Sequence, residues 1–128
     1  MGFFFKKKTR IYKTKKFDKW SRKERINDGE LRGAVDEMNR GLIDADLGSN
    51  IFKKRIAASG RGKRGGARTI LAYKLNDKAF FIFGFTKSDQ GNVSSEDMKP
   101  LKELSKRLLD YNDREIKDAL RSGAIMEV

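Results

Sequence analysis

The sequence TILAYKLNDKAFFIFGFT, residues 69–86, predicts two buried β-strands joined by a tight turn at Asn76. Apolar residues fill most positions on both sides of that turn, and β-branched and aromatic residues are typical of strands. The run at residues 51–57 alternates in part between apolar and charged residues and suits a third strand. Short connections make consecutive strands neighbours, so the three predict an antiparallel meander at the centre of the fold.

The chain before the meander predicts one strand and two helices. Residues 9–14 suit a short strand, and residues 15–25 suit a helix. Asn27 begins a second helix, because Glu30 three residues later completes a capping pair, and Gly41 ends it.

The remaining elements complete an α+β fold. We expect a loop over residues 44–50, before the meander. After the meander, Ser94 and Asn112 each begin a helix, Gly123 ends the second one, and residues 125–128 suit a final short strand. The order of these elements predicts a small antiparallel sheet packed with N-terminal and C-terminal helices.

Basic residues are concentrated in two segments of the chain, whose net charge is +12. Residues 1–25 carry eleven basic and two acidic side chains. Residues 51–76 carry eight Lys or Arg and no Asp or Glu, and within them the stretch SGRGKRGGAR, residues 59–68, holds four glycines and four cations. Packing so much like charge together does not stabilise a fold, so a polyanion is the expected partner.

Composition argues against several kinds of site. The chain has no Cys, which removes disulfides, thiolate zinc sites and Cys nucleophiles, and no His, which removes the usual general base and the commonest metal ligand. Its acidic residues form no convincing metal-binding pair, since Asp44 with Asp46 and Glu96 with Asp97 suit loop and cap positions. No apolar run approaches membrane-spanning length, and the first residues lack the pattern of a signal peptide. We therefore expect a cytoplasmic protein that needs no metal or cofactor and makes no membrane contact.

The same reasoning predicts how the chain is divided. Residues 1–8, MGFFFKKK, have the composition of a disordered basic-aromatic tail. Residues 9–128 are of a length that suits one domain with a modest core, to which nine Phe and one Trp contribute.

The glycines of the basic stretch suit contact with phosphate. Gly60, Gly62 and Gly65 match GxGxxG, but a dinucleotide site needs a helix after that motif, and here a strand follows. A flexible glycine loop with cations instead lets main-chain amides approach a phosphate backbone, while Arg supplies paired donors. The alternative is a solvated hairpin loop without a ligand.

Strand geometry predicts where the cations gather. Arg68 begins a buried strand and Lys87 ends the next one, so antiparallel pairing would bring both to one rim of the sheet beside the glycine loop. The alternative is two strand-end cations that reach only solvent. On the preceding strand Lys54 faces away from Lys53 and Arg55, so one side forms a functional surface and the other a solvated edge.

A set of motifs carries a family resemblance. It comprises KKR at 53–55, GRGKRGGART at 60–69 and FFIFGFTK at 80–87, and it extends to RGLIDADLG at 40–48 and IMEV at 125–128. In this set the chain resembles bacterial type II toxins of the RelE/ParE superfamily, and within it the RelE-like, HigB-type branch. The resemblance covers about residues 10–128.

The resemblance implies a toxin that a cognate antitoxin, acidic or with an acidic segment, binds and neutralises. RelE-like members cut mRNA in the ribosomal decoding site without a metal, and they rely on Lys and Arg, often with a late Tyr or His. Arg68 matches the family's strand Arg, Lys87 the cation that ends the next strand, and Arg61, Lys63 and Arg64 the basic loop. Residues 88–93, SDQGNV, contain no Tyr or His, and there the chain departs from the family pattern.

A chemical hypothesis follows for an RNA substrate. RNA carries its own nucleophile, the 2′-OH, so the protein must supply a base, an acid and charge stabilisation. Without His, a Lys is the available base, and like-charged neighbours favour its deprotonation. Arg68 suits stabilisation of the phosphorane, because it stays protonated and can donate two hydrogen bonds. The predicted catalytic residues are Arg68, Lys87, Lys63 and Arg64, and the predicted RNA-binding residues are Lys53, Lys54, Arg55 and Arg61.

Two other functions remain open at this point. One is a toxin of the same fold that acts on another target, such as gyrase, without RNA chemistry. The other is a basic nucleic-acid-binding domain without catalytic activity.

Overall fold

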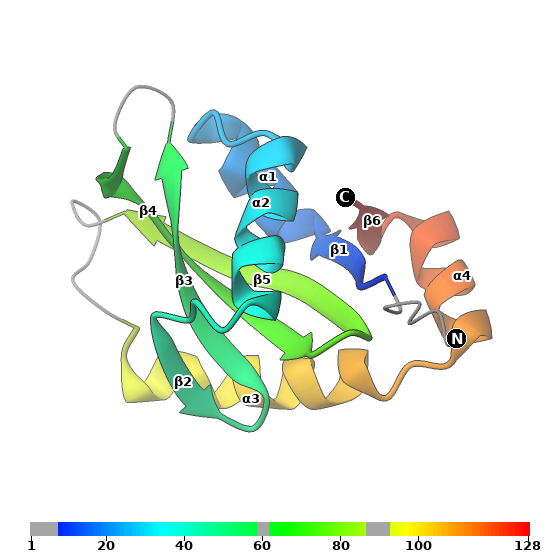
Figure 1. Ribbon diagram of the computed structural model, residues 1–128. Coiled ribbons are helices and arrows are strands. Elements are labelled where there is room, and N and C mark those ends of the chain that lie inside the picture. The colour runs from blue at the N-terminus through cyan, green and yellow to red at the C-terminus, as the bar shows by residue number, and fades with distance from the viewer. Residues whose placement is uncertain (1–7, 59–61, 87–92) are drawn as a thin grey trace, which may run out of the picture.

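Six strands form one mixed sheet in the order β2-β3-β4-β5-β1-β6 (Figure 1). The computed structural model describes residues 8–58, 62–86 and 93–128, and the side chains of residues 57–65 are outside that description. The predicted meander is confirmed, because β3 pairs with β4 and β4 with β5, both antiparallel. The strands are β1 (Arg10–Thr14), β2 (Ala45–Gly48), β3 (Ile51–Ala58), β4 (Gly62–Lys74), β5 (Lys78–Thr86) and β6 (Ile125–Glu127).

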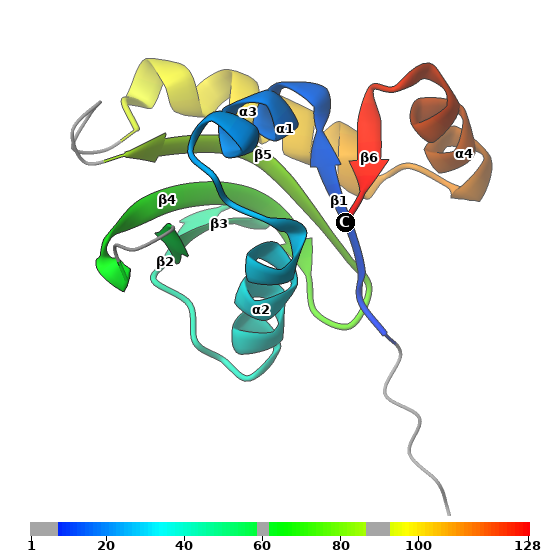
Figure 2. The ribbon, with the colours of Figure 1, turned by 90° about the horizontal axis from the view of Figure 1, so that it is seen from above.

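Four helices cover the two faces of this sheet. Helices α1 (Lys15–Lys23) and α2 (Asp28–Asn39) precede the meander, and α3 (Ser95–Leu109) and α4 (Asp113–Ser122) follow it. Figure 2 shows α2 on one side of the sheet and α3 on the other. The predicted α+β architecture, a sheet packed with N-terminal and C-terminal helices, is therefore confirmed.

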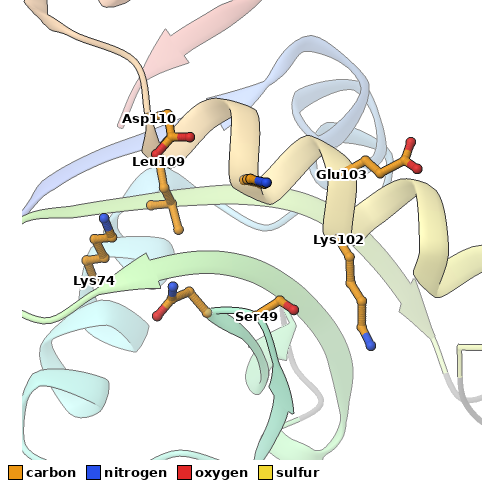
Figure 3. A pocket seen from close by; sticks show the side chains of 8 residues that line it. Ser49, Lys74, Lys102, Glu103, Leu109 and Asp110 are labelled. Atoms are coloured by element: carbon orange, nitrogen blue, oxygen red, sulfur yellow. The ribbon is translucent and has the colours of Figure 1, made fainter.

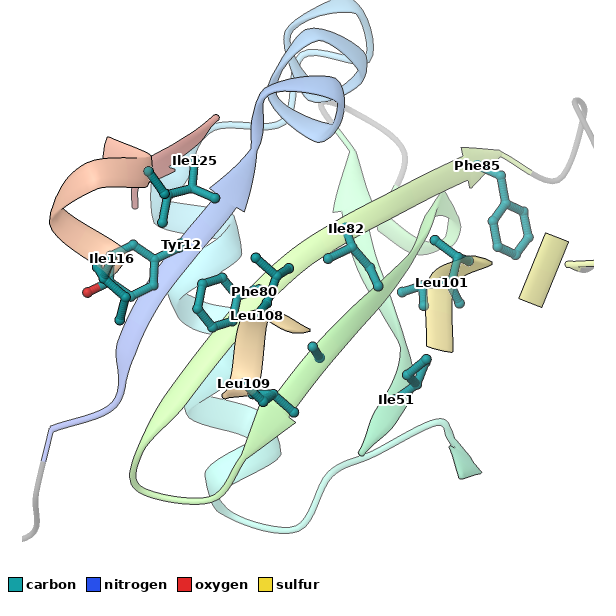
Figure 4. Packing of buried hydrophobic residues seen from close by; sticks show 13 residues of the cluster. Tyr12, Ile51, Phe80, Ile82, Phe85, Leu101, Leu108, Leu109, Ile116 and Ile125 are labelled. Atoms are coloured by element: carbon teal, nitrogen blue, oxygen red, sulfur yellow. The ribbon is translucent and has the colours of Figure 1, made fainter. Parts of the chain in front are cut away.

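Two apolar clusters form the core, one on each face, because successive strand residues point to opposite sides. On one face, Phe80, Ile82 and Ile51 of the sheet pack with Leu101 and Leu108 of α3 (Figure 4). The opposite cluster joins the first two helices to the sheet through residues that include Phe17, Leu31, Met38, Leu71 and Phe81. Full burial of one such side chain contributes about 2 kcal/mol, so these clusters fix where the helices sit.

The predicted helix starts are confirmed. The Asn27 side chain accepts a hydrogen bond from the Glu30 N–H at 2.8 Å, and Ser94 caps α3 in the same manner. Asn112 and Glu115 form a reciprocal capping box at the start of α4. Gly123 ends α4 with a φ of +82°, a conformation that glycine adopts without strain.

Three details of the strands differ from the sequence predictions. Residues 44–50, expected to be a loop, contain strand β2, which pairs with β3 at the sheet edge. The expected glycine loop is mostly strand, since β4 begins at Gly62 and four of its residues bulge opposite one residue of β3. Glycine tolerates such a bulge because it lacks a Cβ. The sheet is also mixed, because β1 runs parallel to β5.

Candidate functional site

Arg68 lies in a row of three side chains that crosses the meander. It pairs directly with Arg55 on β3 and with Phe85 on β5. Residues directly opposite one another on neighbouring strands share a face of the sheet. Phe85 belongs to the core beneath α3, so all three side chains belong to the α3 face.

The guanidinium of Arg68 has an unusual environment. The residue is half-buried, and its Nη1 is buried without a hydrogen-bond partner in the described structure. A buried donor left unpaired costs about 1–3 kcal/mol, and more when it is charged. An anion bound at this point would accept that hydrogen bond, and a phosphate oxygen matches the geometry of the guanidinium.

Arg55 adds a second positive charge beside Arg68. Its side chain is exposed and makes no ion pair with a described residue. Its backbone N–H donates to Oδ2 of Asp44 at 2.7 Å, so that carboxylate extends the edge of the sheet past β2. Like charges directly opposite each other destabilise a sheet, and an anionic ligand between Arg55 and Arg68 would offset that cost.

Lys53 and Lys54 have different environments, as their alternation on β3 predicts. Lys53 is half-buried and pairs with Ile70 on the face that carries Arg68. Lys54 faces α2, where its Nζ lies 2.9 Å from Oε1 of Glu37 and 3.0 Å from the carbonyl of Leu42. Only 4% of the Lys54 side chain is exposed, so it holds α2 and the following loop to the sheet and lies away from the Arg68 row.

The other predicted cations are placed only in part. Arg61 and Lys87 lie outside the described residues, as do residues 1–7 of the predicted tail. Lys63 and Arg64 belong to the backbone of β4, and their side chains are outside the description. The predicted pairing of the two strand ends is seen as far as Thr86, which lies opposite Ala67.

Two features of the site were missed by the sequence predictions. Phe83 and Phe85 belong to the α3 side of β5 together with Phe80, with the ring centroids of Phe83 and Phe85 6.1 Å apart, because a bulge opposite Ile70 and Leu71 shifts the alternation of the strand by one residue. Asp44 was assigned to a loop and not to the β3 edge. The run of aromatic residues at 80–85 was the available signal for the first feature; the second depends on long-range pairing that local patterns do not reveal.

The described part of the chain contains neither a candidate metal site nor a candidate membrane-spanning helix. Among residues 8–58, 62–86 and 93–128, no group of three or more His, Cys, Asp or Glu could hold a metal ion. Within the same residues, no helix has the length and apolar character to cross a membrane.

Comparison with protein families gave a match over most of the chain. The family model described as the RelE toxin of the RelE / RelB toxin-antitoxin system matches residues 9–128. No curated protein matches the sequence.

Proposed function

The chain belongs to the RelE family of toxins from toxin-antitoxin systems, and from that premise we propose that it is a ribosome-dependent mRNA endonuclease that inhibits translation. Its family implies an antitoxin as partner. The observation that supports the proposal best is the buried Nη1 of Arg68, which has no partner among the described residues and lies in a row with exposed Arg55.

In the proposed reaction the RNA supplies the nucleophile. The 2′ oxygen attacks the adjacent phosphorus, the bond to the 5′ oxygen of the next nucleotide breaks, and the products are a 2′,3′-cyclic phosphate and a 5′-OH. Negative charge on the phosphate oxygens increases in the transition state. Arg68 stabilises that charge through its fixed pair of hydrogen-bond donors. In other enzymes, one such donor increases the rate about 10²–10³-fold.

Proton transfer is assigned to lysine in this proposal. The chain has no His, so Lys63 or Lys87 takes the proton of the 2′-OH, and a second cationic group returns a proton to the leaving 5′ oxygen. Arg64 remains a candidate for further charge stabilisation.

The remaining cations would hold the RNA strand. Arg55 and Lys53, on the Arg68 face, are proposed to bind flanking phosphates, and Arg61 to extend that contact. Lys54 is left out of this surface, since its amine is paired with Glu37. Because this set of proton donors is modest, fast cleavage requires that the substrate be held for in-line attack. We propose that the ribosome holds it, which fits action in the cytoplasm.

Inducible expression followed by mapping of mRNA 5′ ends tests the proposal. Wild type should arrest growth and create new 5′ ends at a fixed position within codons, and Arg68→Ala should do neither. Arg121→Ala, on the exposed side of α4, is the matched control and should behave as wild type. Arrest without new 5′ ends would favour another target such as gyrase, and absence of arrest by wild type would favour a non-catalytic binding domain.

A further inference from the structure

A pocket of about 390 Å³ lies between α3 and the strands, away from Arg68. Three lysines line it: Lys74 at the end of β4, and Lys102 and Lys106 on α3. In Figure 3 Lys102 projects from the helix toward the strands, and Lys74 stands across the gap beneath Leu109. The turn between β2 and β3 forms the opposite wall with Ser49 and Asn50.

The three ammonium groups are exposed and make no ion pair with a described residue. Glu103 and Asp110 also border the pocket, but the Glu103 carboxylate points away from the strands (Figure 3). By contrast, buried Lys13 and Lys54 are held by carboxylates. The pocket therefore combines a concave surface with three lysines that outnumber its two acidic residues and make no ion pair with a described residue, a combination that favours an anionic ligand.

The pocket belongs to the same face of the sheet as Arg68. Arg68 and Lys74 are six residues apart on β4, so they share a face and lie about 20 Å apart along the strand. Helix α3 spans that interval, since Leu101 lies toward Phe85 and Leu109 toward the other end (Figure 4). Lys102 and Lys106 therefore stand on α3 between the Arg68 row and Lys74.

The geometry points to a second phosphate-binding site in this pocket, which holds the RNA strand several nucleotides away from the phosphate at Arg68. The inference rests on the proposed function, because it assumes that the Arg68 face binds RNA. Lysines act as point charges toward phosphates, and each phosphate contact adds affinity through release of counterions.

An RNA strand fits this pocket better than an acidic protein segment. The pocket shares its sheet face with Arg68, whose buried Nη1 suits a phosphate oxygen. Ser49 and Asn50 are exposed in a turn with φ values of +56° and +61°, where their side chains offer hydrogen bonds to ribose hydroxyls or base edges.

Oligonucleotides of two lengths test the inference by fluorescence anisotropy. The probes are labelled single strands of four and twelve nucleotides with 2′-O-methyl riboses, which cannot be cut. The variant Lys74→Gln/Lys102→Gln/Lys106→Gln should bind the twelve-nucleotide strand about tenfold more weakly than wild type. The slope of the logarithm of its binding constant against the logarithm of the salt concentration should decrease in magnitude by about 0.7 for each phosphate that the variant no longer neutralises. The four-nucleotide strand can reach from Arg68 to only part of the pocket, so the triple substitution should weaken its binding much less than that of the twelve-nucleotide strand.

The matched control is Arg114→Gln/Lys117→Gln/Arg121→Gln. It removes the same charge from three exposed positions on α4, where Lys117 and Arg121 have the spacing of Lys102 and Lys106 on α3. Equal weakening by the two triple variants would reduce the effect to net charge and overturn the inference, as would an unchanged twelve-nucleotide affinity. Weaker binding of the co-expressed antitoxin with RNA binding intact would also overturn it and assign the pocket to the protein partner.

The two proposals fail in different ways. If binding of the twelve-nucleotide strand depends on the pocket lysines but the wild-type protein creates no new mRNA 5′ ends, the pocket proposal is supported and the endonuclease proposal is contradicted. If new mRNA 5′ ends require Arg68 but the affinity for the twelve-nucleotide strand does not depend on the three lysines, the endonuclease proposal is supported and the pocket proposal is contradicted.

Discussion

At the scale of single residues, Arg68 and Arg55 stand directly opposite each other on β4 and β3, beside Phe85. A protonated guanidinium with a buried nitrogen that no described residue pairs with is a costly arrangement unless a ligand completes it. The planar fork of Arg, and not charge alone, is therefore the feature that we connect with phosphate binding.

Arg68→Lys tests whether cleavage depends on the planar guanidinium of Arg68 or only on its positive charge. Lys keeps one positive charge but cannot donate two parallel hydrogen bonds, so single-turnover cleavage of mRNA on programmed ribosomes should slow about 100-fold. The free energy of unfolding, measured with urea, should not decrease, because the substitution removes an unpaired buried donor. Cleavage by the Lys variant at the wild-type rate would refute the role given to the fork.

Lys53 and Lys54 are neighbours with opposite roles. Lys54→Ala removes the donor to Glu37 and to the Leu42 carbonyl beneath α2, so the free energy of unfolding should fall by about 2 kcal/mol. Lys53→Ala should change it by less than about 0.5 kcal/mol while weakening RNA binding. Urea unfolding measures the stability of both variants, and oligonucleotide anisotropy measures their RNA binding. Equal losses of stability would contradict the opposite roles given to Lys53 and Lys54.

At the scale of elements, α1 packs on β5 at a position where only glycine fits. A Cβ built on Gly84 would lie 2.2 Å from a ring carbon of Trp20. Trp20 and Phe17 lie on the same side of α1, with ring centroids 5.4 Å apart, and Phe17 is also in contact with Phe81 of β5. The helix can approach this closely because residue 84 has no side chain.

Gly84→Ala should lower the free energy of unfolding by about 2 kcal/mol, because the half-buried Trp20 ring has to move from its position against the core. Gly33→Ala is the control: it lies inside α2 with open space around its position, and it should raise stability by about 0.5–1 kcal/mol. Urea denaturation measures both variants. A Gly84→Ala protein as stable as wild type would show that α1 is not docked this closely.

Local signals explain which elements the sequence could predict. Asn27, Ser94 and Asn112 each cap a helix with partners three residues away, so four or five residues contain the whole signal. Strand β2 has only four residues, and its pairing with β3 is stabilised at one end by the carboxylate of Asp44. That contact spans eleven residues, and no local pattern encodes it.

The same distinction applies to the candidate site. Alternation along β3 correctly separated Lys54 from Lys53 and Arg55, because side-chain direction follows from strand geometry. The sequence could not show that Glu37 would pair with Lys54, since α2 and β3 meet only in the fold. The lysines of the α3 pocket were missed for the same reason: Lys74 and Lys102 are distant in sequence and meet across the α3–strand gap.

At the scale of the whole molecule, a buried ion network joins β1 to the first two helices. The Nζ of Lys13 lies 2.7 Å from Asp18 and 2.8 Å from Asp28. The hydrogen bond from Lys13 is the main reason that the pKa of Asp18 lies below its ordinary value. Burial acts to lower the pKa of Lys13, but its hydrogen bonds to Asp18 and Asp28 outweigh burial and raise it.

These shifts predict how stability depends on pH. The contribution of Asp18 is present above the unfolded-state pKa of Asp, about 4, and is lost as the pH falls through the lower folded-state value. The contribution of Lys13 is present below about 10.5 and is lost as the pH rises through the higher folded-state value. The network therefore stabilises the fold fully from about pH 5 to pH 10.

Asp18→Asn measures that contribution. At pH 7 its free energy of unfolding should be about 2 kcal/mol below that of wild type, since a partner of a buried Lys has lost its charge. The difference should shrink as the pH falls below about 4, because the Asp18 carboxyl is protonated first in the unfolded protein, and should be lost as the pH passes below the lower folded-state pKa. Urea titrations between pH 3 and pH 7 decide this, and a difference independent of pH would contradict the network.

Cleavage of a defined mRNA on purified ribosomes by purified protein tests the proposed chemistry at Arg68 without intermediate steps. The mRNA carries either ribose or 2′-deoxyribose at the nucleotide whose 2′ oxygen would attack. The proposed mechanism predicts cleavage of the ribose substrate by wild type, a loss of about 100-fold or more in Arg68→Ala, and no cleavage of the deoxy substrate by either protein. Cleavage of the deoxy substrate, or full activity of Arg68→Ala, would contradict it.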